Sequence, residues 1–302
     1  GAISCLNDQV THLAVDIYLD KEELSDELET IVYVAILFYC RYLTYLTFSQ
    51  QFSSNYRTLA SCNIPQGCSL SSTLTNLTIK VNSFDDCLYL LNGCLQSLSM
   101  LIIRIKKISR SSLNIDKIEK LVKLKSFSLV GEQYSHFYDK LVVPLLRRML
   151  NVEKLSLQLS VIRAERSYIG GNQLYEEILN YLPRLNKFMF NIHTHIVNTG
   201  IEIDLPSDDD IRNSFIKRGF QSVGTCIDKR FINHGCNCHV YSLPYLFCDF
   251  LFMSSCFQGG KFDKVRMLMI LDRYPFEHKL FKIISEDFPF LQKLIILNFN
   301  AQ

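Results

Sequence analysis

The feature of this sequence that most constrains its fold is a short apolar pattern that recurs along the chain. The pattern is an apolar residue, two further residues, a second apolar residue, one residue and a third apolar residue, as in Leu98-Ser-Met-Leu101-Ile-Ile103. It occurs nine times, with first positions at Val10, Leu43, Leu74, Leu98, Leu124, Val152, Leu185, Val265 and Leu291. Successive first positions are 24 to 33 residues apart, except for the 80 residues between Leu185 and Val265. Such a period indicates a repeat architecture, close to the roughly 20–29 residues of leucine-rich repeats.

The pattern predicts a strand in each repeat, because its last three residues alternate and place both apolar ends on one face. Between the strands the apolar spacing becomes helical. The predicted helices are Phe84–Leu91, Ile115–Leu121, Tyr175–Leu182 and His278–Phe288. A strand, a helix and a parallel strand, repeated, form a right-handed solenoid. The predicted fold class is therefore α/β: a leucine-rich-repeat-like solenoid with a parallel concave sheet and convex helices. Only Asn82 stands where an asparagine usually ties successive turns, so we expect an irregular arc.

The long gap predicts an insertion over residues 197–243 within a single solenoid of residues 1–302. Insertions in solenoids map to loops on one face, which is often the binding face. Ser207 followed by three aspartates is typical of a capped helix start. Two strand patterns follow, joined by a turn with a glycine. The insertion is therefore predicted to be a helix and a hairpin, with the elements Ile211–Ile216, Gln221–Asp228 and Cys238–Leu243 and a turn at Asn233–Gly235.

The composition excludes several classes of protein. Hydrophobic residues make up 48% of the chain, which excludes intrinsic disorder. Lys and Arg number 32 against 30 Asp and Glu, so no global field attracts nucleic acid or a membrane surface. The longest apolar run, Ile31–Cys40, is too short for the roughly 20 residues of a membrane span. Eleven cysteines, an odd number in mostly apolar surroundings, favour a reduced chain in the cytoplasm, with the nucleus as the alternative.

No motif predicts a catalytic residue or a cofactor. The glycine pairs at Gly170 and Gly259 lack the frame of a phosphate-binding loop, and no Ser or Cys, His and acid set is recognisable. The chain is therefore predicted not to be an enzyme. A cryptic hydrolase that uses the insertion stays as the weaker alternative, because the residues of a catalytic triad meet in the fold and need not be close in the sequence.

The segment His234-Gly-Cys236-Asn-Cys238-His239 is the strongest metal candidate, because Cys and His are zinc ligands. Its spacing does not match a zinc knuckle, and no second pair completes four ligands. A buried cysteine pair in a hairpin is the preferred interpretation. The set of His193, His195 and Asp204 is weaker still, so no metal site is predicted.

The residues between and just after the apolar strand positions are predicted to face the concave side and to bind a protein partner. In the middle repeats they are polar, as at Lys154, Ser156 and Gln158. In the last two repeats they are apolar: Met267, Met269, Leu271, Ile295 and Leu297. An apolar patch on a concave wall needs a cover. Either the insertion folds back over it, or a partner protein binds there, with the methionines supplying an adaptable surface.

Several segments resemble one family. They are Ser71-Ser-Thr-Leu-Thr-Asn-Leu, Phe84-Asp-Asp-Cys-Leu-Tyr-Leu-Leu-Asn-Gly, Leu182-Pro-Arg-Leu-Asn-Lys-Phe, Tyr241-Ser-Leu-Pro-Tyr and Pro275-Phe-Glu-His-Lys-Leu-Phe. The chain is similar to a lineage-expanded invertebrate family of F-box proteins with leucine-rich-repeat-like bodies. The resemblance implies a non-enzymatic scaffold, in which an N-terminal F-box docks a cullin-type ubiquitin ligase and the repeat body holds a protein substrate. It supplies no catalytic or binding residues.

The chain departs from this family because no clear F-box is present. The nearest stretch, Leu24–Ile31, has Ser25 where an F-box start has proline, and it lies where a convex helix belongs. The contact with a cullin-ligase adaptor is therefore expected only if an F-box precedes Gly1. Without one, the chain is expected to be an adaptor or structural repeat protein with no link to ubiquitin.

Overall fold

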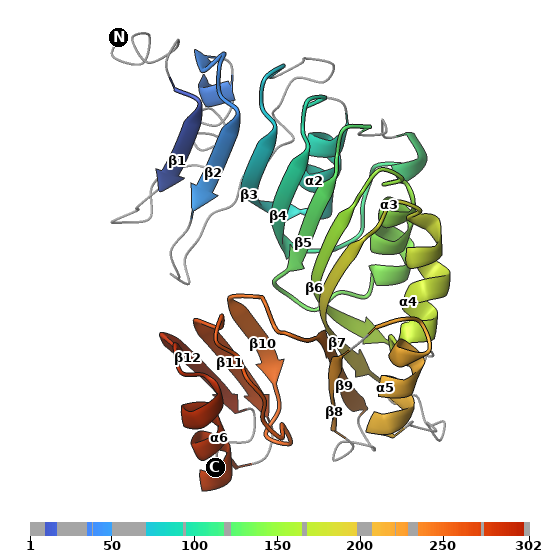
Figure 1. The fold of residues 1–302 in the computed structure, drawn as a ribbon, viewed down its shortest axis with the longest axis vertical. Coiled ribbons are helices and arrows are strands. Elements are labelled where there is room, and N and C mark those ends of the chain that lie inside the picture. Colours follow the sequence, from blue (N-terminus) through green and yellow to red (C-terminus); the bar gives the residue numbers. More distant parts are fainter. Residues whose placement is uncertain are drawn as a thin grey trace. The chain divides into compact units, whose positions relative to one another are not determined.

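The protein has a mixed α/β fold, seen here in a computed structural model (Figure 1). The structure describes residues 10–16, 35–37, 39–49, 71–92, 95–117, 122–164, 168–197, 207–220, 222–228, 235–272 and 275–298. The chain falls into two compact units: unit 1 is Gly1–Val161 with Glu176–Phe188, and unit 2 is Ile162–Tyr175 with Met189–Gln302.

The described strands and helices follow the predicted order of repeats over most of the chain. The strands are β1 (His12–Asp16), β2 (Tyr45–Ser49), β3 (Asn76–Ser83), β4 (Met100–Lys107), β5 (Ser126–Gly131), β6 (Lys154–Arg163), β7 (Lys187–Ile196), β8 (Val223–Asp228), β9 (Cys236–Ser242), β10 (Asp249–Met253), β11 (Met267–Asp272) and β12 (Lys293–Asn298). The α-helices are α2 (Phe84–Leu91), α3 (Val143–Arg147), α4 (Gly171–Glu177), α5 (Asp208–Ile216) and α6 (His278–Asp287). Short 3-10 or π turns cover Ile115–Lys117, Tyr138–Val142 and Leu179–Tyr181. None of the helices in the described part of the chain has both the length and the apolar character needed to cross a bilayer.

The parallel pairing predicted from the repeat is confirmed for β1 to β6. These strands begin an open sheet of nine strands in the order β1-β2-β3-β4-β5-β6-β7-β9-β8. The second apolar position of each pattern lies opposite that of the next, since Leu77 pairs with Leu101 and Leu101 pairs with Phe127. All three side chains are buried, so the apolar rows of successive strands form the core of unit 1.

The parallel series does not continue through the insertion as one sheet. Strand β9 pairs with β7 in the antiparallel direction, and β8 pairs antiparallel with β9. The insertion therefore occupies the hydrogen-bonding edge of β7 that the next repeat would use. The last repeats instead form a separate parallel sheet of three strands, in the order β10-β11-β12.

Strand β10 was not predicted, although its residues fit the repeat pattern. Phe247, Phe250 and Phe252 have the required spacing, but Asp249 interrupts the apolar run. In the structure Asp249 is buried and Phe250 pairs with Leu268. The register then shifts before Met253, and Phe252 has a φ of 60°, in the left-handed region. This bulge breaks the alternation on which the sequence prediction depends.

The predicted helices agree with the structure to different degrees. Helix α2 spans Phe84–Leu91 as predicted, and α6 ends one residue before the predicted Phe288. Helix α4 begins at Gly171, four residues before the predicted start, and a 3-10 turn at Leu179–Tyr181 replaces its second half. Of the predicted helix Ile115–Leu121, only the 3-10 turn Ile115–Lys117 lies within the described residues.

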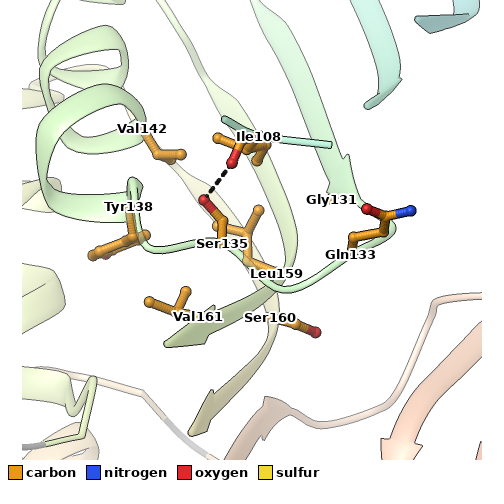
Figure 2. A pocket seen from close by; sticks show the side chains of 9 residues that line it. All are labelled: Ile108, Gly131, Gln133, Ser135, Tyr138, Val142, Leu159, Ser160 and Val161. Carbon is orange, nitrogen blue, oxygen red and sulfur yellow. Dashed lines mark hydrogen bonds between the residues drawn. The ribbon is translucent and has the colours of Figure 1, made fainter. Parts of the chain in front are cut away.

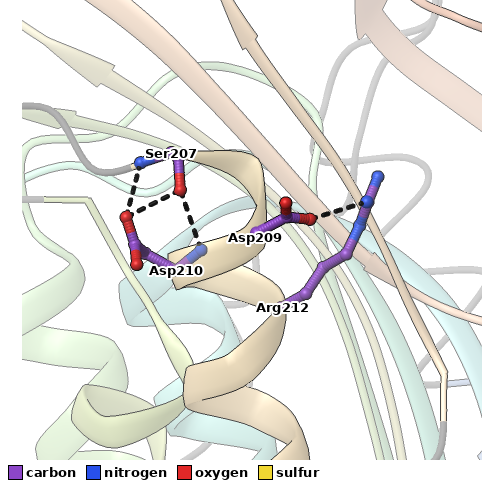
Figure 3. Close-up of polar contacts among 4 residues, drawn as sticks. All are labelled: Ser207, Asp209, Asp210 and Arg212. Carbon is purple, nitrogen blue, oxygen red and sulfur yellow. Dashed lines mark hydrogen bonds and ion pairs between the residues drawn. The ribbon is translucent and has the colours of Figure 1, made fainter.

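The insertion folds as a helix and a hairpin, as predicted. At the start of α5 the Ser207 hydroxyl accepts a hydrogen bond from the Asp210 N–H at 3.1 Å, and Asp210 accepts one from the Ser207 N–H at 3.0 Å (Figure 3). The Ser207 hydroxyl also donates to Asp210 Oδ2 at 2.7 Å (Figure 3). This bond, followed by the bond from the Ser207 N–H, lowers the pKa of Asp210. This reciprocal cap fixes where α5 begins. The predicted turn residues Asn233 and His234 lie outside the described part of the chain.

Candidate protein-binding surface

The apolar positions predicted to bind a partner form a ladder across β11 and β12. Met269 of β11 lies opposite Ile295 of β12, and Leu271 lies opposite Leu297. Met267 precedes them on the same face of β11 because strand residues alternate. We call these five residues the β11–β12 surface. Met267, Met269, Leu271 and Ile295 are half-buried and Leu297 is exposed.

The opposite face of the three-stranded sheet packs against α6. Leu268 and Ile270 of β11 lie in an apolar cluster with Leu280 and Ile284, which come from one side of α6. The rings of Phe262 and Phe288 stack at 4.7 Å beside them. Helix α6 therefore covers the face of β11 that is opposite the β11–β12 surface, and it anchors the sheet.

The burial changes at the edge strand β12. Leu294 and Ile296 are the pattern residues that should be buried, yet their side chains are 40% and 39% exposed. Leu297, on the other face of the strand, is 41% exposed. Among the strands that the structure describes, β12 lies at the end of the order β10-β11-β12, so it is an edge strand of this sheet. An edge strand with apolar side chains on both faces is a template for pairing with another chain.

The polar candidates lie in unit 1 and differ in exposure. Ser156 pairs with Ser128 and Gln158 pairs with Val130 across β5 and β6. Both are buried, whereas Lys154 at the start of β6 is exposed. Of these three residues, only Lys154 offers an exposed side chain to a partner.

Tyr241 of the insertion makes ring contacts on the helix side of the three-stranded sheet. Tyr241 of β9 contacts Phe250 at 5.5 Å and Phe262 at 5.9 Å, both members of the cluster that contains Leu268. Gly224 permits this position of the ring, because a Cβ there would lie 2.1 Å from Tyr241. The sequence analysis left open whether the insertion or a partner protein covers the β11–β12 surface. These ring contacts lie on the face opposite the β11–β12 surface.

Within unit 2, a series of buried polar side chains joins β9 and β7 to the start of β10. His239 Nε2 donates to Asn191 Oδ1, the Asn191 amide donates to the Tyr245 hydroxyl at 2.7 Å, and that hydroxyl donates to the Asp249 carbonyl at 2.7 Å. Burial lowers the pKa of His239 to about 3, and burial followed by the charges of His239 and His195 lowers that of His193. Both imidazoles are therefore neutral near pH 7. The hydrogen bonds from His239 through Asn191 and Tyr245 to Asp249 form a structural network. Sequence reasoning missed it, because its members come from separate strands and a loop.

The candidate zinc ligands do not converge. Cys236 and Cys238 are buried on one face of β9, whereas His239 points to the other face because strand residues alternate. Within the described residues no group of three or more His, Cys, Asp or Glu side chains could hold a metal ion. His234 and Asp204 lie outside those residues.

A small pocket in unit 1 is lined by Ile108 just after β4, by the ends of β5 and β6, and by the segment from Gln133 to Val142 (Figure 2). Ser135 crosses it by donating a hydrogen bond to the Ile108 carbonyl at 2.7 Å. Its volume of about 10 Å³ is at the lower limit for a single water molecule. This pocket therefore cannot hold a metabolite.

No protein-family model matches the chain, and no similar sequence is found among curated proteins.

Proposed function

We propose that the chain is a non-enzymatic protein-recognition module of the cytoplasm or nucleus, built as a leucine-rich-repeat-like solenoid. In the form we favour, it is the substrate-binding body of an F-box-type ubiquitin-ligase receptor. Support for the solenoid comes from the parallel register, in which equivalent pattern positions lie opposite one another from β1 to β6.

The observation that carries the recognition role is the apolar edge at β12. Three of its side chains are about 40% exposed on two faces, and Leu297 continues the ladder of the β11–β12 surface. Single exposed apolar residues are ordinary, but adjacent ones on an edge strand need an explanation. The partner that fits is an extended segment of another protein, which would add a strand beside β12 and place apolar side chains against Leu297 and Ile295.

The proposal is tested by capture from the protein's native cells, followed by quantitative mass spectrometry. Leu297→Asp places a charge on the β11–β12 surface at an exposed site, so the fold should tolerate it. Val122→Asp is the matched control, because Val122 is 66% exposed and lies in unit 1. A reproducible set of proteins that Leu297→Asp loses and Val122→Asp retains supports the role. Equal capture by all three chains would contradict it.

The same experiment separates the two forms of the proposal. Cullin-ligase components among the captured proteins, retained by Leu297→Asp while the substrate is lost, support the receptor form. A partner that depends on Leu297 without any ligase component supports a plain adaptor. The F-box-like stretch Leu24–Ile31 lies outside the described residues.

A further inference from the structure

Two cysteines far apart in the sequence meet in unit 2. Cys226 lies in β8 and Cys256 follows β10, yet their Sγ atoms are 3.2 Å apart. Neither forms a disulfide. A disulfide bond measures about 2.05 Å, so the two sulfurs need to approach by only about 1 Å to form one.

The segment that carries Cys256 is held in place on both sides. The Ser255 N–H donates to the buried carboxylate of Asp272 at 2.9 Å, at the end of β11. On the other side, Phe257 packs in the core against Phe262 at 5.5 Å. These anchors keep Cys256 directed toward β8, so the sulfur contact does not depend on a chance loop conformation.

The two thiols differ in their surroundings. Cys256 lines an open pocket of about 820 Å³, together with Gln258, Glu277, Lys279 and Ile283, and Cys226 does not line it. The hydroxyl of Ser254 lies 2.7 Å from Cys256 Sγ and 3.8 Å from Cys226 Sγ. The hydrogen bond with Cys256, followed by burial, raises the pKa of Cys226. Cys226 does not line the pocket through which the oxidant enters, and its thiol stays protonated near pH 7, so it reacts second.

We propose that Cys226 and Cys256 form a reversible redox pair, which a low-molecular-weight disulfide entering through this pocket oxidises. The Cys256 thiolate attacks one sulfur of the small disulfide, forms a mixed disulfide and releases one small thiol. Cys226 loses its proton and attacks Cys256 Sγ, which releases the second small thiol and forms the bond between Cys226 and Cys256. Two protein thiols are oxidised and one small disulfide is reduced to two thiols. The bond would link the inserted hairpin to the three-stranded sheet.

The first test uses the unmodified chain, reduced and then equilibrated with mixtures of reduced and oxidised glutathione. We expect one bridged peptide pair that contains Cys226 and Cys256, a loss of two titratable thiols, and full reversal by dithiothreitol. The thermal midpoint of the bridged chain should rise by roughly 5 °C or more, because the bond closes a long loop. A bridge that forms only in unfolded protein, or that joins other cysteines, would overturn the proposal.

Serine variants test the order of the two steps. Cys226→Ser should accumulate one glutathione adduct at Cys256, because the resolving thiol is absent. Cys256→Ser should form neither the bridge nor an adduct at Cys226. Cys248→Ser is the matched control, since Cys248 is exposed and lies outside the pair, and it should bridge as the unmodified chain does. In Cys226→Ser, a glutathione adduct at Cys248 with none at Cys256 would contradict the proposed entry of the small disulfide through the pocket.

Discussion

At the scale of single residues, unit 2 depends on polar groups that are buried and paired. Tyr245 is central, because its hydroxyl accepts from Asn191 and donates to the Asp249 carbonyl. A buried hydrogen bond adds little net stability, but a partner left without its bond has a high cost. Such residues fix how β7 and β9 meet the start of β10.

The change Tyr245→Phe keeps the ring and removes the hydroxyl. It leaves the Asn191 amide and the Asp249 carbonyl without this partner, so we expect a loss of about 1–3 kcal/mol in the free energy of unfolding. Urea denaturation measures it. Tyr181→Phe is the control, because Tyr181 is exposed and its ring contact with Arg147 survives the change. Equal stabilities of the two variants would refute the buried polar chain.

His239 gives the fold a dependence on pH. The unfolded chain binds a proton at this histidine near pH 6.5, whereas the folded chain does not until about pH 3. The contribution of His239 to stability is therefore nearly constant above pH 7 and falls as the pH drops below 6.5. From pH 7.5 to 5.5 this group alone should remove about 1.4 kcal/mol from the free energy of unfolding. His239→Gln should reduce the pH-dependent loss by that amount, and the exposed control His136→Gln should not.

At the scale of elements, a helix or strand begins where a local contact fixes its end. The cap of α5 shows this, because Ser207 and Asp210 satisfy each other's backbone N–H groups. The sequence Ser-Asp-Asp-Asp predicted this start correctly. Strand β10 could not be predicted in this way. Its bulge at Phe252 depends on pairing with β11, and the residues near β10 do not indicate that pairing.

Ser207→Ala removes the hydroxyl that accepts from the Asp210 N–H. We expect a loss of about 0.5–2 kcal/mol, the usual cost of an N-cap hydroxyl. Asp209→Asn is the control, because within the described residues Asp209 pairs with the exposed Arg212, at 3.4 Å (Figure 3). Such surface pairs contribute little. Denaturation monitored by circular dichroism measures the free energy of unfolding of both variants. A larger loss for Asp209→Asn than for Ser207→Ala would contradict the cap.

At the scale of the whole molecule, the repeat pattern predicted the parallel sheet, its register and its buried rows. It could not predict that β9 of the insertion pairs with β7, because pairing between distant strands produces no periodic pattern in the sequence. The same holds for the meeting of Cys226 with Cys256, and of His239 with Asn191 and Tyr245.

The buried rows make a prediction about stability. Leu101 and Leu155 occupy equivalent pattern positions in β4 and β6 and are almost fully buried. Leu101→Ala and Leu155→Ala should each cost about 2–5 kcal/mol, because each leaves a cavity in a packed core. Leu150→Ala, at an exposed leucine just before β6, should cost far less. Thermal denaturation compares the three, and an unchanged midpoint for either core variant would show the register to be wrong.

The most direct test of the recognition role is site-specific photo-crosslinking in native cells. A photoreactive phenylalanine analogue is placed at position Leu297 in one chain and at position Val122 in another. The account predicts discrete, reproducible crosslinked proteins from position 297 and none from position 122. Crosslinks from position 122 alone, or from neither position, would contradict the assignment of the β11–β12 surface as the binding surface.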